Sequence, residues 1–422
     1  MKTTKTPLIK FNNTNSKAIP HYDDYAVAVN KVKEALMDKI GYNFKLYTSD
    51  DDLEEIGNTI EQMLVENEVD VQILGNVYDT VGVSTIKFTE GEKYIVTPSL
   101  INNIFYFPKY DVAIVKMPIY QSHEDYEEDF IFAKDDTCLL AFLNFIIEKQ
   151  RHNMLGGINV LTDTEDGIER TREKVTHQIQ RKDILLEETV KTDIFRSIDE
   201  FFLESGTFYK EYNIPYKRGI LLYGSPGNGK TTLVKSIAGS VSAPVVYWQI
   251  TEYTTSYSIK EVFSTVNKMA PMVLIIEDID SMPEEARSVF LNTLDGATSK
   301  EGIFLIGTTN YPEQIDPALI NRAGRFDRAY EIKQPGDALR REYLRKKGLS
   351  QFVDEDTLFS LTKKTKGLSI AQLNELYMSI ALQWHYEKQV DVEKIVGDLQ
   401  TNHRRTIRKE WDTEDYADKL GF

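Results

Sequence analysis

One stretch of the chain has the residue types and the spacing of a phosphate-binding loop. It follows the pattern GxxxxGK[ST], in which small residues let backbone N–H groups crowd around an anion. The lysine can reach the outer phosphates of a nucleotide as a point charge, and the hydroxyl that follows it can bind Mg²⁺. We predict that Thr231 binds Mg²⁺ and that phosphates are bound by this set: Gly224, Ser225, Pro226, Gly227, Asn228, Gly229, Lys230, Thr231 and Thr232.

The residues on either side predict the strand and the helix that such a loop needs. The apolar run 219–223 is typical of a buried strand, and residues 232–239 are typical of a helix. The N-terminus of a helix adds partial positive charge where phosphates would lie. An ordinary glycine-rich turn is the alternative, because the pattern also arises by chance. The predicted strand and helix favour the phosphate loop.

A second chemical signal is a predicted strand that ends in carboxylates. Four apolar residues, 273–276, run into Glu277 and Asp278, as in a buried parallel strand that delivers a carboxylate to bound Mg²⁺. One carboxylate can hold the metal through water while its neighbour orients the attacking water. Many buried strands end in Asp, so the run is a weak signal alone. Its position downstream of Lys230 makes it a strong one.

More polar groups follow the next predicted strand, residues 303–307. Asn310 comes after its carboxyl end, where ligands collect in doubly wound sheets. The alternative for this residue is a turn position before a proline. Three arginines come next: Arg322, Arg325 and Arg328. They are either surface ion pairs or fingers inserted into a neighbouring subunit's site, where guanidinium stabilises charge on a transferred phosphoryl group.

The order of these motifs resembles that of AAA-type ATPases, the ring-forming branch of P-loop NTPases. The phosphate loop, the acidic strand, the TTN motif 308–310 and the arginine-containing segment 316–328 occur in the family's order, and the likeness covers about residues 183–400. Within the family, the chain is most similar to the Bcs-type branch, which holds mitochondrial Rieske-protein translocases and bacterial relatives. The segments that favour this branch are Ile214-Pro215-Tyr216-Lys217-Arg218-Gly219, Glu277-Asp278 and Leu294-Asp295-Gly296.

The resemblance implies ATP hydrolysis, with ATP and Mg²⁺ as cofactors, and a role for each matching residue. Glu277 would take the metal-side position, partly through water, and Asp278 would polarise the attacking water. Asn310 would sense the γ-phosphate. Arg322 and Arg325 would be the fingers that act on the neighbouring subunit.

Two departures from the family pattern affect these expectations. Most members carry Asp then Glu where this chain has Glu277 then Asp278, and because Asp is one methylene shorter, slower turnover is a hypothesis. The pore-loop region, 251–258, is short and lacks the aromatic-apolar-glycine signature with which many unfoldases grip a chain. Tyr253 or Tyr257 lines a pore in one interpretation and is ordinary packing or surface in the other.

We predict an α/β fold: a P-loop AAA doubly wound parallel sheet with a small helical lid, preceded by an α+β N-terminal domain. The predicted parts are a flexible tail (1–20), an α+β client domain (21–182), the large ATPase subdomain (183–334), the lid (335–400) and a C-terminal tail (401–422). In the client domain, the acidic run 124–129 is interpreted as solvated surface and 163–182 as a charged connector. Adenine is expected to contact the connector 184–190 and the lid, which offers no arginine at 368–372.

The composition limits the partners and the compartment. Lys and Arg number 50 against 66 Asp and Glu, and a net charge of −16 argues against a non-specific nucleic-acid binder. The single cysteine, Cys138, excludes an intramolecular disulfide and fits a reducing compartment. No apolar stretch reaches the length of a membrane span, and the N-terminus lacks the apolar core of a signal peptide. We therefore expect a cytoplasmic protein without a transmembrane segment.

Two functions are consistent with these patterns. The first is a homo-oligomeric ring, expected to be a hexamer, that remodels, chaperones or translocates a protein client bound by the N-terminal domain. The second is a nucleotide-gated structural assembly in which hydrolysis is weak. The net charge disfavours a DNA-directed motor. The sequence contains no HExxH motif, which disfavours an attached zinc protease of the familiar type.

Overall fold

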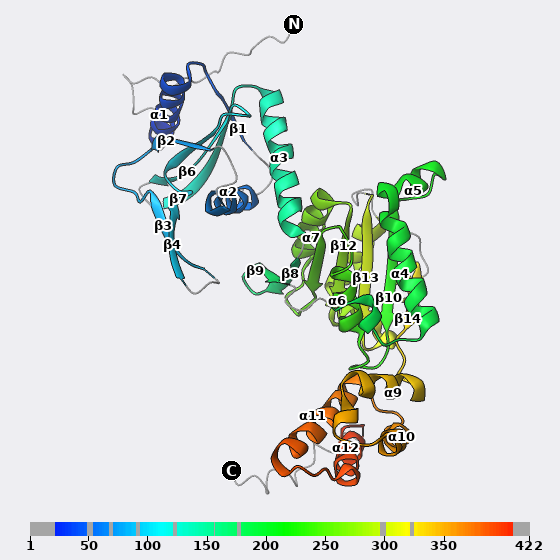
Figure 1. The fold of residues 1–422 in the computed structure, drawn as a ribbon. Helices are drawn as coiled ribbons and strands as arrows, with labels where there is room; N and C mark the ends of the chain where they lie inside the picture. Colours follow the sequence, from blue (N-terminus) through cyan, green and yellow to red (C-terminus); the bar gives the residue numbers. More distant parts are fainter. Residues whose placement is uncertain are drawn as a thin grey trace. The chain divides into compact units, whose positions relative to one another are not determined.

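The computed structural model forms two compact units, Met1–Gln150 and Arg151–Phe422 (Figure 1). The predicted tail 1–20 lies outside the residues that the structure describes, as does most of the predicted tail 401–422. The described residues are 22–48, 54–66, 71–89, 93–120, 125–155, 157–174, 179–295, 301–320 and 325–407.

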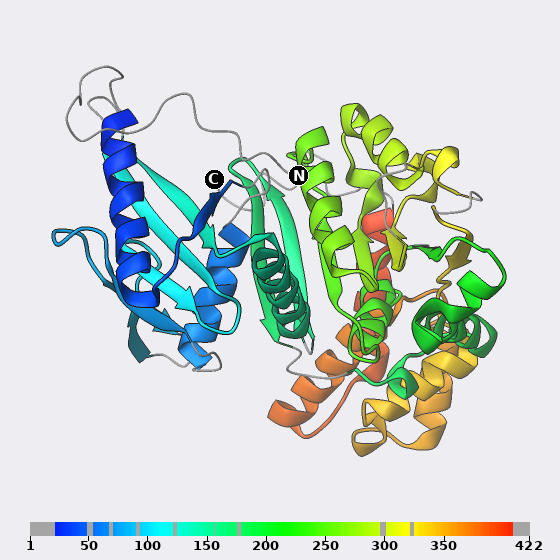
Figure 2. The same cartoon turned by 90° about the horizontal axis from the view of Figure 1, so that it is seen from above.

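The first unit is an α+β domain around a five-stranded antiparallel sheet of order β1-β7-β6-β5-β2. Side chains alternate between its two faces, so that Ile104 and Tyr106 of β5 pack with α1 while Phe105 and Phe107 pack with α2 and α3. Figure 2 shows α1 and α2 on opposite sides of the sheet. The elements are α1 (Tyr22–Ile40), β1 (Lys45–Tyr47), α2 (Glu54–Glu66), β2 (Gln72–Asn76), β5 (Asn103–Phe107), β6 (Val112–Tyr120), β7 (Asp125–Ala133) and α3 (Asp136–Met154).

A separate two-stranded hairpin, β3 (Ser84–Thr89) and β4 (Lys93–Pro98), completes the first unit. The acidic run 124–129, interpreted as solvated surface, belongs to a strand from Asp125 onward: these residues form the start of β7 and pair with β6, and Glu127 is exposed.

The second unit contains a seven-stranded sheet of order β14-β10-β13-β12-β11-β8-β9. Its strands run parallel except the edge strand β9, which pairs antiparallel with β8. Helices α4 and α6 cover one face, and α7 and α8 cover the other. The elements are β8 (Gly157–Thr164), β9 (Gly167–Lys174), α4 (Glu188–Phe202), α5 (Thr207–Glu211), β10 (Lys217–Tyr223), α6 (Lys230–Ala238), β11 (Val245–Gln249), α7 (Ser256–Met269), β12 (Met272–Glu277), α8 (Glu284–Asp295), β13 (Ile303–Thr309) and β14 (Arg328–Glu331).

The predicted domain boundary at residue 182 is wrong. The strand β8, assigned by sequence to the N-terminal domain, pairs with β11 of the second unit, and part of the predicted connector 163–182 is the strand β9. The boundary between the units falls inside α3 instead. Local sequence patterns do not reveal this, because the paired residues Asn159 of β8 and Val246 of β11 lie far apart in the chain.

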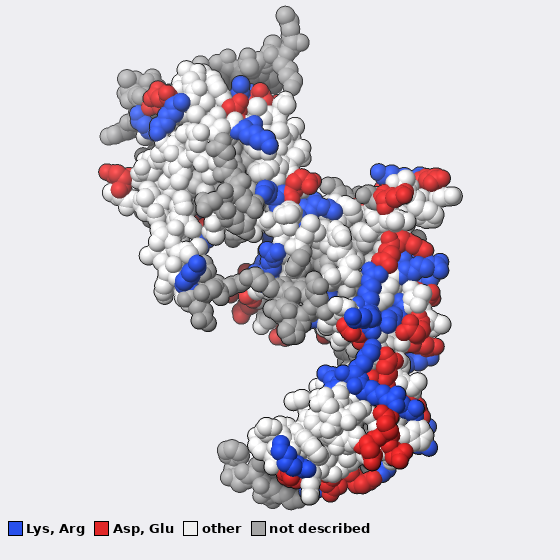
Figure 3. All heavy atoms as spheres, viewed as in Figure 1, with Lys and Arg blue, Asp and Glu red and all other residues white. Residues whose placement is uncertain are grey.

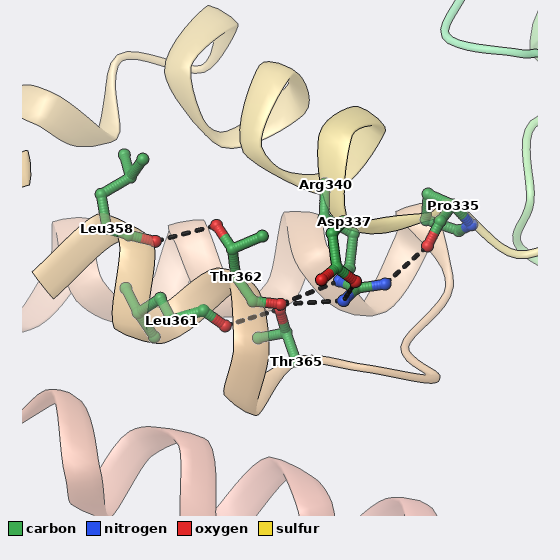
Figure 4. Close-up of polar contacts among 7 residues, drawn as sticks. All are labelled: Pro335, Asp337, Arg340, Leu358, Leu361, Thr362 and Thr365. Carbon is green, nitrogen blue, oxygen red and sulfur yellow. Dashed lines mark hydrogen bonds and ion pairs between the residues drawn. The ribbon is translucent and has the colours of Figure 1, made fainter. Parts of the chain in front are cut away.

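A helical lid follows the sheet, as predicted. It consists of α9 (Asp337–Lys346), α10 (Glu355–Lys364), α11 (Ile370–Glu387) and α12 (Val392–Ile407), so its last helix continues beyond the predicted end at residue 400. Figure 4 shows how Arg340 holds the lid together. Its buried guanidinium donates to the carbonyl of Pro335 at 2.7 Å, to Asp337 at 2.6 Å and to the carbonyl of Thr362 at 2.9 Å.

Substituting Arg340 by methionine is expected to lower the free energy of unfolding by about 2–4 kcal/mol. The change removes a buried charge and the guanidinium donors to the carbonyls of Pro335 and Thr362, the second of which keeps its hydrogen bond from the Thr365 hydroxyl at 3.3 Å. Urea denaturation followed by circular dichroism measures the effect. The exposed Arg345, which pairs with Glu355 at 2.5 Å, provides the matched control, because its substitution by methionine should cost below about 1 kcal/mol. Equal losses in the two variants would contradict the assignment.

Candidate active site

The phosphate loop has the geometry that its sequence predicts. It leaves the end of β10 and enters α6, whose first residue is Lys230. Gly229 caps this helix with φ +94°, and Gly227 has φ +76°, a left-handed backbone region that favours glycine. The prediction of a strand, a glycine-rich turn and a helix is confirmed, and the alternative of an ordinary turn does not account for the contacts described next.

Lys230 is buried and turned back onto its own loop. Its ammonium donates to the carbonyls of Gly224 at 2.5 Å and Ser225 at 3.2 Å. Burial lowers its pKa, and the carboxylates of Asp278 and Asp280 oppose that shift. The ammonium therefore lies near two carboxylates that the sequence places about fifty residues away.

Three neighbouring parallel strands bring the other predicted groups to the same edge of the sheet. The strands β10, β13 and β12 are adjacent, so the segments after their carboxyl ends meet. The backbone N–H of Asp278 donates to the Thr308 hydroxyl at 3.2 Å. Asn310 donates its side-chain amide to the carboxylate of Asp278, also at 3.2 Å. Asn310 therefore lies beside the acidic end of β12, and its role as a sensor of the γ-phosphate stays a prediction.

A cavity of about 440 Å³ joins these groups. Its walls come from the phosphate loop, from the carboxyl ends of β12 and β13, and from the lid helices α9 and α11. The lining residues are Pro226, Gly227, Gly229, Lys230, Thr231, Thr232, Glu277, Asp278, Thr308, Asn310, Tyr343, Ile370, Ala371 and Asn374.

The electrostatics of the cavity set Asp278 apart from an ordinary surface carboxylate. Its side chain faces the open cavity, yet the surrounding protein raises its pKa through loss of hydration, and nearby Asp280 raises it further. Lys230 acts in the opposite direction. A carboxylate with a raised pKa is a better proton acceptor near neutral pH than one with its usual pKa.

Comparison with known proteins identifies the domain around this cavity. Residues 220–334 match the model of the ATPase family associated with various cellular activities (AAA). Residues 220–334 form an AAA ATPase domain. The reaction of such a domain is ATP hydrolysis, and the predicted α/β fold with its parallel sheet and C-terminal helices is confirmed.

The chain is similar in sequence to several curated proteins. The ATP-dependent zinc metalloprotease FtsH 2 of Thermoanaerobacter sp. (strain X514) is 29% identical over 56% of this chain and 49% of its own length. FtsH of Aquifex aeolicus is 31% identical over 54% of this chain and 39% of its own. The cell division cycle protein 48 homolog of Archaeoglobus fulgidus is 30% identical over 50% of this chain and 32% of its own length. The chain thus spans half or less of the length of these relatives.

The residues around the cavity fit the ATP and Mg²⁺ that AAA domains use. The loop offers backbone N–H groups beside a helix N-terminus, which suits phosphate. Thr231 offers a hydroxyl, and Glu277 and Asp278 offer carboxylates, the hard oxygen donors that Mg²⁺ prefers. Bound there, Mg²⁺ would neutralise charge on the outer phosphates. The AAA domain thus has donors for both cofactors in one cavity.

The lid wall of the cavity contains two residues that sequence analysis missed. Tyr343 of α9 donates its hydroxyl to the Asn374 carbonyl of α11 at 3.2 Å, and burial raises the pKa of Tyr343 to about 12. The phenol therefore stays protonated. Of the two segments expected to contact adenine, the lid lines this cavity. Of the connector 184–190, Ile184 and Leu186 are buried in the core between α4 and the sheet, and no described residue of it lines the cavity.

The two predicted fingers have different outcomes. Arg322 lies in 321–324, outside the described residues. Arg325 is only 3% exposed, and its guanidinium pairs with Asp295 and donates to that carboxylate from Nε at 2.5 Å. A guanidinium buried in its own subunit does not reach a neighbouring one, so Arg325 is not assigned as a finger. Its ion pair with Asp295 instead positions the segment that packs beside Gly219.

Substituting Arg325 by methionine is therefore expected to lower the free energy of unfolding by about 2–4 kcal/mol, because the carboxylate of Asp295 loses its guanidinium partner. Thermal and urea denaturation of the purified variant measure the loss. The exposed Arg328 in the same segment provides the control, since Arg328→Met should change stability by less than about 0.5 kcal/mol. An Arg325 variant as stable as the parent chain would restore the finger interpretation.

The predicted pore-loop region is well ordered by side-chain contacts. The buried carboxylate of Asp163, from β8, accepts hydrogen bonds from Trp248 at 3.0 Å and from Thr254 at 2.5 Å. Tyr253 is 45% and Tyr257 is 74% exposed. Of the two interpretations left open, tight packing is therefore excluded for both tyrosines.

In the described part of the chain, no helix has the length and apolar character needed to cross a membrane.

Proposed function

We propose that this chain assembles into a homo-oligomeric ring, a hexamer, that couples ATP hydrolysis to remodelling of a protein client. The observation that supports the proposal most is the convergence of Lys230, Asp278 and Asn310 on one cavity with phosphate-loop geometry. The segment 321–328 contains Arg322, which would reach the cavity of the next subunit. AAA proteins also usually form rings.

In this proposal, Thr231 and Glu277 hold Mg²⁺, Asp278 accepts the proton of the attacking water, and Asn310 orients that water or the γ-phosphate. Arg322 enters the cavity of the neighbouring subunit. The unit Met1–Gln150 holds the client, and the exposed Tyr253 and Tyr257 contact it during turnover.

The sequence favours a place in the Bcs-type branch for the same reasons as before: the segment 214–219, the order Glu277-Asp278 and the segment 294–296. The reversed acidic pair also supports the alternative, a nucleotide-gated assembly with weak hydrolysis, because the shorter Asp278 stands where most members have Glu.

The test measures ATP turnover per subunit across a range of protein concentrations, with sedimentation velocity on the same samples. A ring that shares its sites between subunits should turn over faster per subunit as the ring population rises. Constant turnover in a strictly monomeric protein would contradict the proposal. Rings without measurable turnover would favour the nucleotide-gated assembly.

A further inference from the structure

The β3–β4 hairpin presents four large apolar side chains on one face. Ile86 pairs across the strands with Val96, and Phe88 pairs with Tyr94, so all four point to the same side. Their exposed fractions are 70%, 69%, 63% and 75%, in that order. The rings of Phe88 and Tyr94 lie 5.1 Å apart. We call these four side chains the hairpin face.

The hairpin is anchored, so this exposure does not come from a loose segment. On the opposite side, Thr97 is buried and Lys87 forms an ion pair with Glu61 of α2. At its base, Ser99 donates its backbone N–H to the carbonyl of Val83 at 3.0 Å, and the Asn103 side chain donates to the same carbonyl at 2.9 Å. These contacts hold the hairpin through its other side and its base. The hairpin face is therefore held in place while its four side chains stay exposed.

The surroundings of the hairpin face are also open. In the part of the chain that the structure describes, neither β3 nor β4 pairs with a third strand, so both outer edges can accept one. Figure 3 shows mostly uncharged side chains over the visible side of the first unit, whereas both signs of charge are interspersed over the second. Exposed apolar surface of this kind marks an interaction site.

We propose that the hairpin face binds extended apolar segments of incompletely folded polypeptides. An extended chain presents side chains to one side at every second residue, which matches the spacing of Ile86 and Phe88 along β3. The proposal deepens the proposed function and rests on it, since it gives the client-binding surface and the chemistry of the client.

The size of the hairpin face favours such a segment over a second copy of the chain. Four side chains offer about 400 Å², about half of the roughly 800 Å² that each partner buries in a stable pair. One short segment would therefore bind weakly and reversibly, and several faces in one ring would strengthen its retention. The net charge of −16 disfavours the other apolar partner, an anionic membrane surface.

The test uses the full chain and a fluorescein-labelled peptide of alternating valine and threonine, followed by fluorescence anisotropy. A peptide of the same composition with the valines grouped together is the comparison. Phe88→Ser should weaken binding of the alternating peptide about tenfold. Leu140→Ser, which removes an equally exposed leucine from α3, should leave it unchanged. The pair Ile86→Thr with Val96→Thr keeps the strand propensity of the hairpin and should also weaken binding about tenfold.

Unchanged binding in both hairpin variants, or equal affinity for the two peptides, would overturn the proposal. So would hairpin-dependent flotation with phosphatidylcholine vesicles in the absence of peptide binding, or a change of oligomeric state in the hairpin variants without a change in peptide affinity. ATP turnover is measured in parallel. Wild-type turnover with no peptide binding defeats this inference alone, whereas hairpin-dependent binding with no turnover supports the docking surface and defeats the proposed ATPase cycle.

Discussion

Arg322→Ala is expected to lower kcat for ATP hydrolysis about 1000-fold while leaving the fold intact. If the guanidinium of Arg322 stabilises charge on the phosphoryl group in a neighbouring subunit, its loss removes that stabilisation from the transition state. Steady-state turnover at saturating ATP measures the effect. Arg328→Ala removes an exposed arginine from the same segment, and its turnover should stay within about twofold of the parent chain.

Mixing two inactive variants tests whether Arg322 acts between subunits. In rings that combine Arg322→Ala with Asp278→Asn, some sites pair the intact cradle of the first variant with the intact arginine of the second. Random equal mixing should restore up to about a quarter of parental turnover. If the mixture stays as inactive as its components although mixed rings form, the arginine acts within its own subunit or has no role in the reaction.

Asp278→Asn is expected to lower kcat about 100- to 1000-fold, because the amide cannot accept the proton of the attacking water. It can still accept the hydrogen bond from Asn310, so the local geometry should survive. The matched control is Asp278→Glu, which keeps the carboxylate and restores the order of acidic residues typical of the family at the second position. It should retain turnover or raise it. Full hydrolysis by Asp278→Asn would defeat the assignment.

The raised pKa of Asp278 gives this prediction a pH dependence. Turnover should fall on the acid side at a higher pH than an ordinary aspartate would give, since Asp278 must be ionised to act.

Because the pKa of Asp278 in the folded protein lies above its unfolded value, ionised Asp278 opposes folding at neutral pH. That cost disappears as the pH falls through the folded pKa. Asp278→Asn should therefore be more stable at pH 7 by only about 0.5 kcal/mol, since the carboxylate is open to solvent.

The edge of the sheet that lines the cavity could be predicted from sequence because its signals are local. A glycine-rich loop between a strand and a helix, and acidic or amide residues directly after buried strands, each depend on neighbouring residues. The parallel order of β10, β13 and β12 then brings Lys230, Asp278 and Asn310 together without further information. The cavity confirms that these groups meet.

Other features depend on contacts between residues far apart in the sequence. Because β8 pairs with β11, the boundary between the units lies in α3 and not at residue 182. Arg325, predicted to be a finger, forms a buried ion pair with Asp295 of its own chain. Both outcomes follow from packing, since an arginine or an apolar run is compatible with several partners until the chain folds.

The sequence by itself thus determined the chemistry of the phosphate loop and of Asp278, because these groups are read from short-range patterns. Tertiary structure alone decided which lid residues face the cavity, with Tyr343 and Asn374 the examples, and which apolar side chains stay exposed on the β3–β4 hairpin. The physical reason is that burial is a property of the surrounding elements, whereas backbone conformation and side-chain chemistry are properties of the residues themselves.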